Sequence, residues 1–223
     1  MVKRAKRRQN SVMRIKIQLA VAVATLVLAG CASSSVKKTW KSPTYQGGPV
    51  KNVAVLAVDD RGMVRIGFEN RFVRDFRERG QEATATHELL TLAEIKADKE
   101  SAETRLRNAG ADSVLIVRLV DSTTYANEVR VTPALFVPVV TGIDSSYGWY
   151  DYYSVAFVDM GTTWGNTETK VYLDTSLYDL KNNQRLWSTQ TVTMVKEDSD
   201  RLAEVDDLVA KIVAALSKDG MVK

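Results

Sequence analysis

The order of the predicted elements places this chain in the α/β (α+β) class, as one mixed sheet with helices packed on it. Two continuous apolar runs, 52–58 and 113–120, are typical of strands buried on both faces. Helical patterns separate the early strands, so the first half is predicted to be β-α-β-α-β with right-handed crossovers. Strict alternation over 171–194 predicts an antiparallel hairpin, and an amphipathic helix follows it at the C-terminus.

Local signals mark the ends of these elements. The turn residues Asp59-Asp60-Arg61-Gly62 end the first strand. A helix with Phe68, Phe72 and Phe76 on its inner face ends at Gly80, and a short strand covers 82–86. A single helix is predicted from Thr91 to Asn108, ending at Gly110, and the last helix is predicted to begin at Asp198 or Ser199.

The length and charge limit the function classes. The 223 residues suit one domain of ordinary size, which we place at 51–223. Residues 1–30 hold seven basic residues and no acid, so the rest of the chain has 24 basic and 27 acidic residues. The basic character of the whole chain therefore belongs to its N-terminus, and no nucleic-acid partner is expected.

Residues 1–30 have the pattern of an export signal. Basic residues precede the ten-residue apolar run Leu19–Leu28, and small residues follow it. The run is shorter than the roughly 20 apolar residues that a membrane helix needs. Met13 also opens a compact signal of its own, so translation could start at Met1 or at Met13.

The end of this signal resembles a bacterial lipobox. Leu28-Ala29-Gly30-Cys31 matches the motif in which diacylglycerol is joined to the cysteine thiol before cleavage. The resemblance implies a covalent lipid on Cys31, the only cysteine, as a membrane anchor; the alternative is a plain secretory signal. Ala32 after the cysteine implies the periplasmic face of the outer membrane. The polar residues 31–50 are predicted to be a lipidated tether that reaches on the order of 60 Å when extended.

Residues 133–166 form an unusually aromatic segment, predicted to be a hairpin insertion. Two interpretations stay open: a protein-contact surface, because aromatic rings suit interfaces, or a satellite core over the sheet. A membrane-inserting hairpin is a third, although Pro133 and Pro138 would interrupt one strand. The exposed face of the 171–194 hairpin, with Tyr172, Tyr178 and Trp187, is predicted to extend the contact surface. The candidate interaction residues of the segment are Tyr147, Trp149, Tyr150, Tyr152, Tyr153, Phe157 and Trp164.

Groups for catalysis are scarce in the sequence. His87 is the only histidine, and we expect it to be exposed or to cap a local turn rather than to act as a base. The sequence contains no nucleophile elbow, no phosphate-binding glycine loop and no histidine–cysteine set for zinc. Neither enzymatic activity nor a cofactor beyond the covalent lipid is therefore expected.

Two further motifs resemble those of envelope lipoproteins. The run 108–115 contains Gly-Ala-Asp before a strand, and the hairpin contains Leu-Tyr-Asp-Leu and Leu-Trp-Ser. They resemble an uncharacterised family of Gram-negative outer-membrane lipoproteins, with a domain similar to those of the curli-secretion lipoprotein, the penicillin-binding-protein activators and the amino-terminal part of TolB. The resemblance implies protein contacts in envelope assembly, maintenance or regulation, with an unidentified envelope partner. A secretion or pore subunit, a cell-wall-binding domain or enzyme, and a homo-oligomer stay open.

Overall fold

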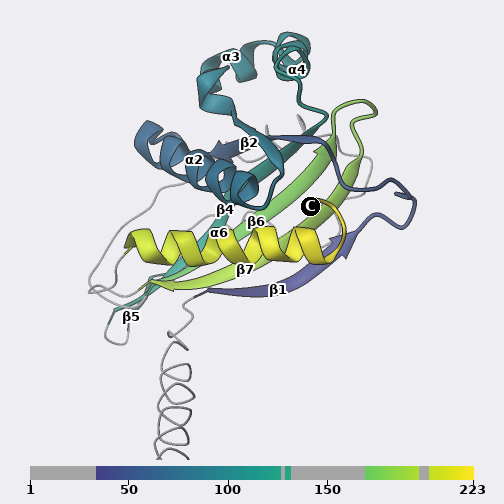
Figure 1. The fold of residues 1–223 in the computed structure, drawn as a ribbon. Helices are drawn as coiled ribbons and strands as arrows, with labels where there is room; N and C mark the ends of the chain where they lie inside the picture. The colour runs from purple at the N-terminus through teal and green to yellow at the C-terminus, as the bar shows by residue number, and fades with distance from the viewer. Residues whose placement is uncertain (1–33, 127–128, 132–168, 196–200) are drawn as a thin grey trace, which may run out of the picture. The chain divides into compact units, whose positions relative to one another are not determined.

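The computed structural model describes residues 34–126, 129–131, 169–195 and 201–223, and the fold is given for these ranges. They form one mixed sheet in the order β1-β7-β6-β4-β2-β3, with β5 paired to β4 (Figure 1). The strands are β1 (Ser34–Lys41), β2 (Asn52–Val58), β3 (Glu82–Ala85), β4 (Ser113–Ala126), β5 (Val129–Val131), β6 (Thr169–Asp179) and β7 (Arg185–Val195). The helices are α2 (Gly62–Glu78), η1 (Thr86–Glu88, a 3₁₀ turn), α3 (Leu92–Ala97), α4 (Lys99–Asn108) and α6 (Arg201–Lys218).

The pairing of the strands confirms the predicted fold class. β2 lies between β3 and β4 and runs parallel to both. β4, β6, β7 and β1 then pair antiparallel in that spatial order, and α6 follows as the C-terminal helix. The parallel part of the sheet is therefore built from the β-α-β-α-β half, as expected for buried apolar strands joined by helices.

The predicted single helix over 91–108 is wrong, because the structure divides it into α3 and α4 at Asp98. Asp98 has an extended backbone, and its carboxylate accepts a hydrogen bond from the Ser101 backbone N–H at 3.0 Å. Aspartate in this position satisfies a donor that the first helical turn leaves unpaired. The side chain therefore starts a new helix where the apolar pattern alone indicated a continuous one.

Two predicted helix stops are confirmed by their backbone conformation. Gly80 follows α2 with φ 74° and Gly110 follows α4 with φ 86°. In both cases the glycine N–H donates to a carbonyl of the last turn, from Arg77 and Arg107 respectively. The left-handed region favours glycine, so these residues end the helices with little strain.

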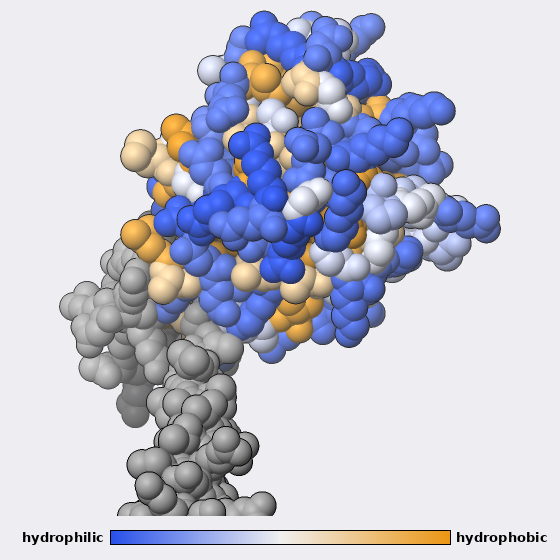
Figure 2. Space-filling view, in the orientation of Figure 1, coloured by the Kyte–Doolittle hydropathy of each residue, from blue (hydrophilic) through white to orange (hydrophobic). Residues whose placement is uncertain are grey.

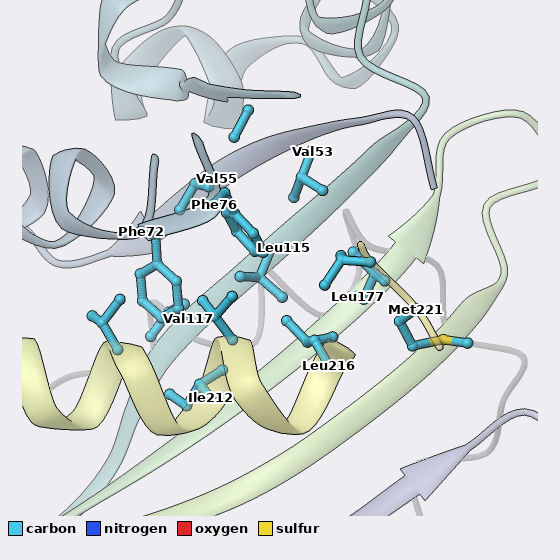
Figure 3. Close-up of a cluster of buried hydrophobic side chains, with 14 of the residues drawn as sticks. Val53, Val55, Phe72, Phe76, Leu115, Val117, Leu177, Ile212, Leu216 and Met221 are labelled. Carbon is cyan, nitrogen blue, oxygen red and sulfur yellow. The ribbon is translucent and has the colours of Figure 1, made fainter. Parts of the chain in front are cut away.

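Apolar side chains cover both faces of the sheet. On one face, α2 and α6 pack against the central strands, and Figure 3 shows Phe72, Ile212 and Leu216 directed toward Leu115 and Val117 of β4. On the other face, α3 and α4 cover side chains of β2 and β4. Residues that alternate along one strand thus enter two different cores, which explains why β2 is apolar throughout.

The predicted tether over 31–50 is wrong from Ser34 onward. Ser34–Lys41 forms the edge strand β1, which pairs antiparallel with β7 from Ser34–Thr193 to Lys41–Trp187. Val50 is buried in the core. The polar, lysine-rich sequence is typical of an edge strand, whose free side faces water and must not pair with other chains.

Candidate functional site

The principal predicted site residues lie outside the described ranges. These are Cys31 and the aromatic residues Tyr147, Trp149, Tyr150, Tyr152, Tyr153, Phe157 and Trp164. Their assignments therefore stay predictions, as does the hairpin insertion at 133–166. The described residues instead supply a buried polar cluster around Glu69, a pocket and the attachment of Ser34 to the fold.

The 171–194 hairpin does not present the aromatic surface that we predicted. Tyr178 and Trp187 are both 0% exposed, and only Tyr172 remains half-buried. Trp187 lies in the core under α6, where its indole N–H donates to Asp219 Oδ2 at 2.7 Å. Tyr178 belongs to the core on the opposite face of the sheet. The two rings therefore stabilise the fold and are not available as contact residues.

Burial also changes the acid–base behaviour of Tyr178. Removal of its phenol from water raises the pKa above the usual value of 10.0, and Asp174 adds to this effect while Arg185 opposes it. Burial disfavours the charged phenolate because the protein interior solvates charge poorly. The folded chain therefore holds this proton to a higher pH than the unfolded chain.

We expect this difference to weaken the fold in alkali. Below about pH 10 the phenol is neutral in both states, and its full contribution to stability is present. Above that pH the unfolded chain releases the proton while the folded chain keeps it, so the free energy of unfolding falls as pH rises. Urea unfolding across this range should show a smaller loss for Tyr178→Phe than for the wild type. The matched control is Tyr172→Phe on the same strand, and equal losses for both variants would contradict the assignment.

Glu69 is the centre of the most extensive buried polar cluster among the described residues. Its carboxylate is 0% exposed and accepts five hydrogen bonds. The donors to Oε1 are Ala57 N (3.1 Å), Arg65 Nε (2.9 Å) and Thr86 Oγ1 (2.9 Å). Oε2 takes the backbone N–H and the Nδ1 of His87, at 2.7 and 2.8 Å. One side chain of α2 therefore joins the end of β2 to the segment after β3.

Arg65 completes the cluster on the same helix. Its guanidinium is buried and also donates to Thr86 Oγ1 and to the carbonyl of Leu90, at 3.1 and 2.9 Å. Sequence reasoning missed this pair, although a signal was present. Arg65 and Glu69 precede Phe72 and Phe76 at helical spacing, so two charges occupy the face that the phenylalanines bury.

The geometry gives the ring of His87 a positioning partner, Glu69. Its side chain is 17% exposed, and Glu69 orients the ring through Nδ1. Carboxylate-oriented imidazoles occur in catalytic sites, yet there they face a nucleophile or a metal. Within the described ranges, no group of three or more metal-binding side chains is found. The expectation that His87 is exposed or caps a local turn is wrong, because its half-buried ring bonds Glu69, 18 positions earlier in the chain.

The residues after β2 also have a local role. Asp59 Oδ1 accepts the Arg61 backbone N–H at 2.8 Å, and its carboxylate pairs with the Arg61 guanidinium. The hydrogen bond that the Arg61 side chain donates to Asp59 is the main reason that the pKa of Arg61 is raised. The predicted turn at Asp59-Asp60-Arg61-Gly62 is therefore confirmed.

A pocket of about 510 Å³ lies at the opposite end of the parallel strands. Its wall includes Tyr45, whose pKa is raised by burial and by the nearby charges of Asp179 and Asp112. Asp112 accepts the backbone N–H groups of Lys51 and Asn52, and so joins the start of β4 to the start of β2. Asp179 accepts N–H groups of its own turn. The aspartates of the Gly-Ala-Asp and Leu-Tyr-Asp-Leu motifs therefore bind backbone N–H groups and stabilise the local backbone.

Ser34, the first described residue, is held at three atoms. Its N–H donates to Asp207 Oδ2 at 3.3 Å, and its carbonyl accepts from Lys211 Nζ at 2.6 Å. Its hydroxyl lies 3.0 Å from that of Thr193. Ser34 is 5% exposed, so it is firmly attached to the fold.

Within the described ranges, none of the helices has both the length and the apolar character that crossing a bilayer requires.

Comparisons with known proteins show similarity only at the level of solved structures. No protein-family model and no curated protein matches the chain. It is similar to a PelC dodecamer structure from Paraburkholderia phytofirmans, with 14% identity, a TM-score of 0.46, and coverage of 85% of this chain and 99% of that one. It is also similar to lipoprotein GNA1162 from Neisseria meningitidis, with 14% identity, a TM-score of 0.39, and coverage of 75% and 99%. At this identity and these TM-scores, neither similarity assigns an activity or a partner to the chain.

Proposed function

We propose that this chain is a lipid-anchored protein of the Gram-negative cell envelope that works through protein contacts and not through catalysis. The observation that carries the proposal is the lipobox-like Leu28-Ala29-Gly30-Cys31 placed directly before the folded domain. Cys31 would carry the lipid, and buried methylene groups would hold the protein to the membrane. The residue Ala32 supports a position on the periplasmic face of the outer membrane.

The hydrogen bonding of the described polar groups supports the non-catalytic part of the proposal. Glu69 and Arg65 form hydrogen bonds with backbone groups and neighbouring side chains. Asp59 and Asp112 likewise accept hydrogen bonds from backbone N–H groups. An active site instead needs polar groups that converge on a cavity with bonds left for substrate. The resemblance to curli-secretion, penicillin-binding-protein-activator and TolB domains stays a prediction, and no shared activity is proposed from it.

The proposed contact surface is the aromatic segment, with Trp149 and Tyr152 as its test residues. Tyrosine and tryptophan provide large contact area and lose few rotamers on binding. The proposed surface does not include Tyr178 and Trp187, because both side chains are buried.

The proposal predicts that Cys31→Ser moves the protein from the membrane fraction to the soluble fraction of a Gram-negative host. Serine has no thiol to acylate, so labelled palmitate should enter the wild type and not the variant. In the same cells, crosslinking followed by mass spectrometry should identify an envelope protein attached to the wild type. Trp149→Ala combined with Tyr152→Ala should reduce that crosslink while leaving acylation intact.

Lys181→Ala, at an exposed turn, is the matched control and should retain both palmitate and crosslink. Wild-type protein without palmitate, or membrane fractionation unchanged by Cys31→Ser, would contradict the anchoring. An unchanged crosslink in the double aromatic variant would contradict only the contact surface.

A further inference from the structure

We infer that the end of the domain at which β1, α2 and α6 begin is a surface that contacts the lipid bilayer. The inference rests on the proposed lipidation of Cys31, and it adds which end of the folded domain the membrane meets. It depends on three observations: the short link from Cys31 to Ser34, the exposed aliphatic side chains at this end, and the pairing of the nearby charges.

The link between lipid and fold is short because the expected tether is part of the sheet. Three peptide units separate Cys31 from Ser34, which span at most about 11 Å. Ser34 itself is fixed by Asp207 and Lys211 of α6 and by Thr193 of β7. An acylated Cys31 therefore holds this end of the sheet at the bilayer surface, where a long tether would leave the orientation of the domain open.

Exposed aliphatic side chains gather at the same end. The large hydrophobic residues that are exposed within the described ranges are Met63 (83%), Ile66 (37%) and Leu202 (61%). Met63 and Ile66 lie in the first turns of α2, and Leu202 lies in the first turn of α6. Figure 2 shows hydrophobic residues along the left margin of the view, where both helices begin in Figure 1. Isolated exposed aliphatic residues are common on protein surfaces. Close to a lipid anchor, however, these side chains can bury their apolar area in the bilayer interface.

Contacts join the second half of α2 to the second turn of α6, which in turn binds Ser34. Asp206, in the second turn of α6, binds Arg71 and Arg74 of α2 through Oδ1 at 2.9 and 2.8 Å. The neighbouring Asp207 accepts the N–H of Ser34. Both helices begin on the same side of the sheet (Figure 1). Leu202 and Ile66 lie before these contacts, toward the helix starts, so the aliphatic residues and Ser34 share one end of the domain.

Several charges near this end are paired, which lowers the cost of approaching a bilayer. Asp206 is neutralised by its two arginines, and Lys211 pairs with Asp207 at 2.8 Å. Arg61 pairs with Asp59 beside Met63. Paired charges at a membrane interface lose less solvation than isolated ones, because each retains its partner as water is displaced.

Single labelled cysteines in the acylated protein test the orientation. Acylation consumes the thiol of Cys31, so a cysteine introduced by Met63→Cys or Leu202→Cys is the only free thiol for an environment-sensitive fluorophore. Lys181→Cys is the matched control, since it lies in the exposed turn at the other end of β6, about 30 Å along the strand. Each labelled protein is reconstituted in vesicles of phosphatidylethanolamine and phosphatidylglycerol, with and without brominated acyl chains.

Fluorophores at positions 63 and 202 should shift to shorter wavelength on reconstitution and lose emission in brominated vesicles, while the fluorophore at 181 should do neither. Equal quenching at the three positions, or quenching only at 181, would overturn the inferred surface. Flotation of the unlabelled wild type with the vesicles separates the two proposals. A wild type that floats while positions 63 and 202 remain in water leaves the anchoring intact and overturns the surface alone; a wild type that does not float overturns both.

Discussion

Replacing Glu69 with alanine is expected to lower the free energy of unfolding by about 3–5 kcal/mol, as is usual when one partner of a buried ion pair is removed. The change leaves the buried Arg65 guanidinium without its carboxylate and leaves the Ala57 N–H without an acceptor. It also frees the segment after β3, because His87 loses both of its bonds to Glu69. Urea unfolding followed by circular dichroism at neutral pH measures the difference.

The matched control for this prediction is Glu78→Ala on the same helix. The Glu78 side chain is 66% exposed and lies 4.0 Å from Arg74, so its loss should change stability by no more than about 0.5 kcal/mol. Adding Arg65→Met to Glu69→Ala should restore part of the stability, because it removes the stranded charge. Equal losses in Glu69→Ala and Glu78→Ala would show that the cluster does not hold the fold as described.

Replacing Trp187 with alanine is expected to cost about 3–5 kcal/mol, the usual range for removing a large aromatic side chain from a core. The indole is fully buried between the sheet and α6, and the surrounding side chains would have to collapse into the space it leaves. The variant also loses the hydrogen bond to Asp219, which lies just after α6. Thermal and urea unfolding should both report the loss.

Trp187→Phe separates packing from the hydrogen bond, and should cost less than the alanine variant because it retains most of the ring volume. Trp40→Ala provides a control at a half-buried tryptophan of β1, where Arg185 lies 4.6 Å from the ring centroid. That contact contributes about 0.5–1 kcal/mol. A loss in Trp187→Ala no greater than in Trp40→Ala would contradict the assignment of Trp187 to the core.

The burial of Trp187 shows what the alternation of apolar residues can and cannot predict in this chain. Alternation along 171–194 correctly predicts two faces for each strand, but it does not say which face a helix will cover. Leu186 and Trp187 are adjacent, yet both lie in the core under α6, at a register shift between β6 and β7, while Tyr178 lies in the core on the other face. The aromatic contact surface predicted on this hairpin is wrong for that reason.

Two other errors have related causes. Polar residues at 34–41 suggested a tether because an edge strand needs few apolar residues, and its hydrogen-bonding partner β7 lies about 150 positions later in the chain. The division of 91–108 at Asp98 was missed because the apolar pattern continues across it, while the capping hydrogen bond to Ser101 is a local event. In both cases backbone hydrogen bonding decided the outcome.

By itself, the sequence determined the class of fold, the order of β2, α2, β3, β4, β6, β7 and α6, and the glycine stops after α2 and α4. The export signal with its candidate lipid site stays a prediction. These features depend on neighbours within a few residues, where apolar spacing and backbone preference act. The tertiary structure alone decided that Glu69 and Arg65 form a buried pair, that Trp187 lies in the core, and that Ser34 begins the fold beside α6. Each of these depends on which distant segments meet, because burial and ion pairing arise only when separate elements exclude water together.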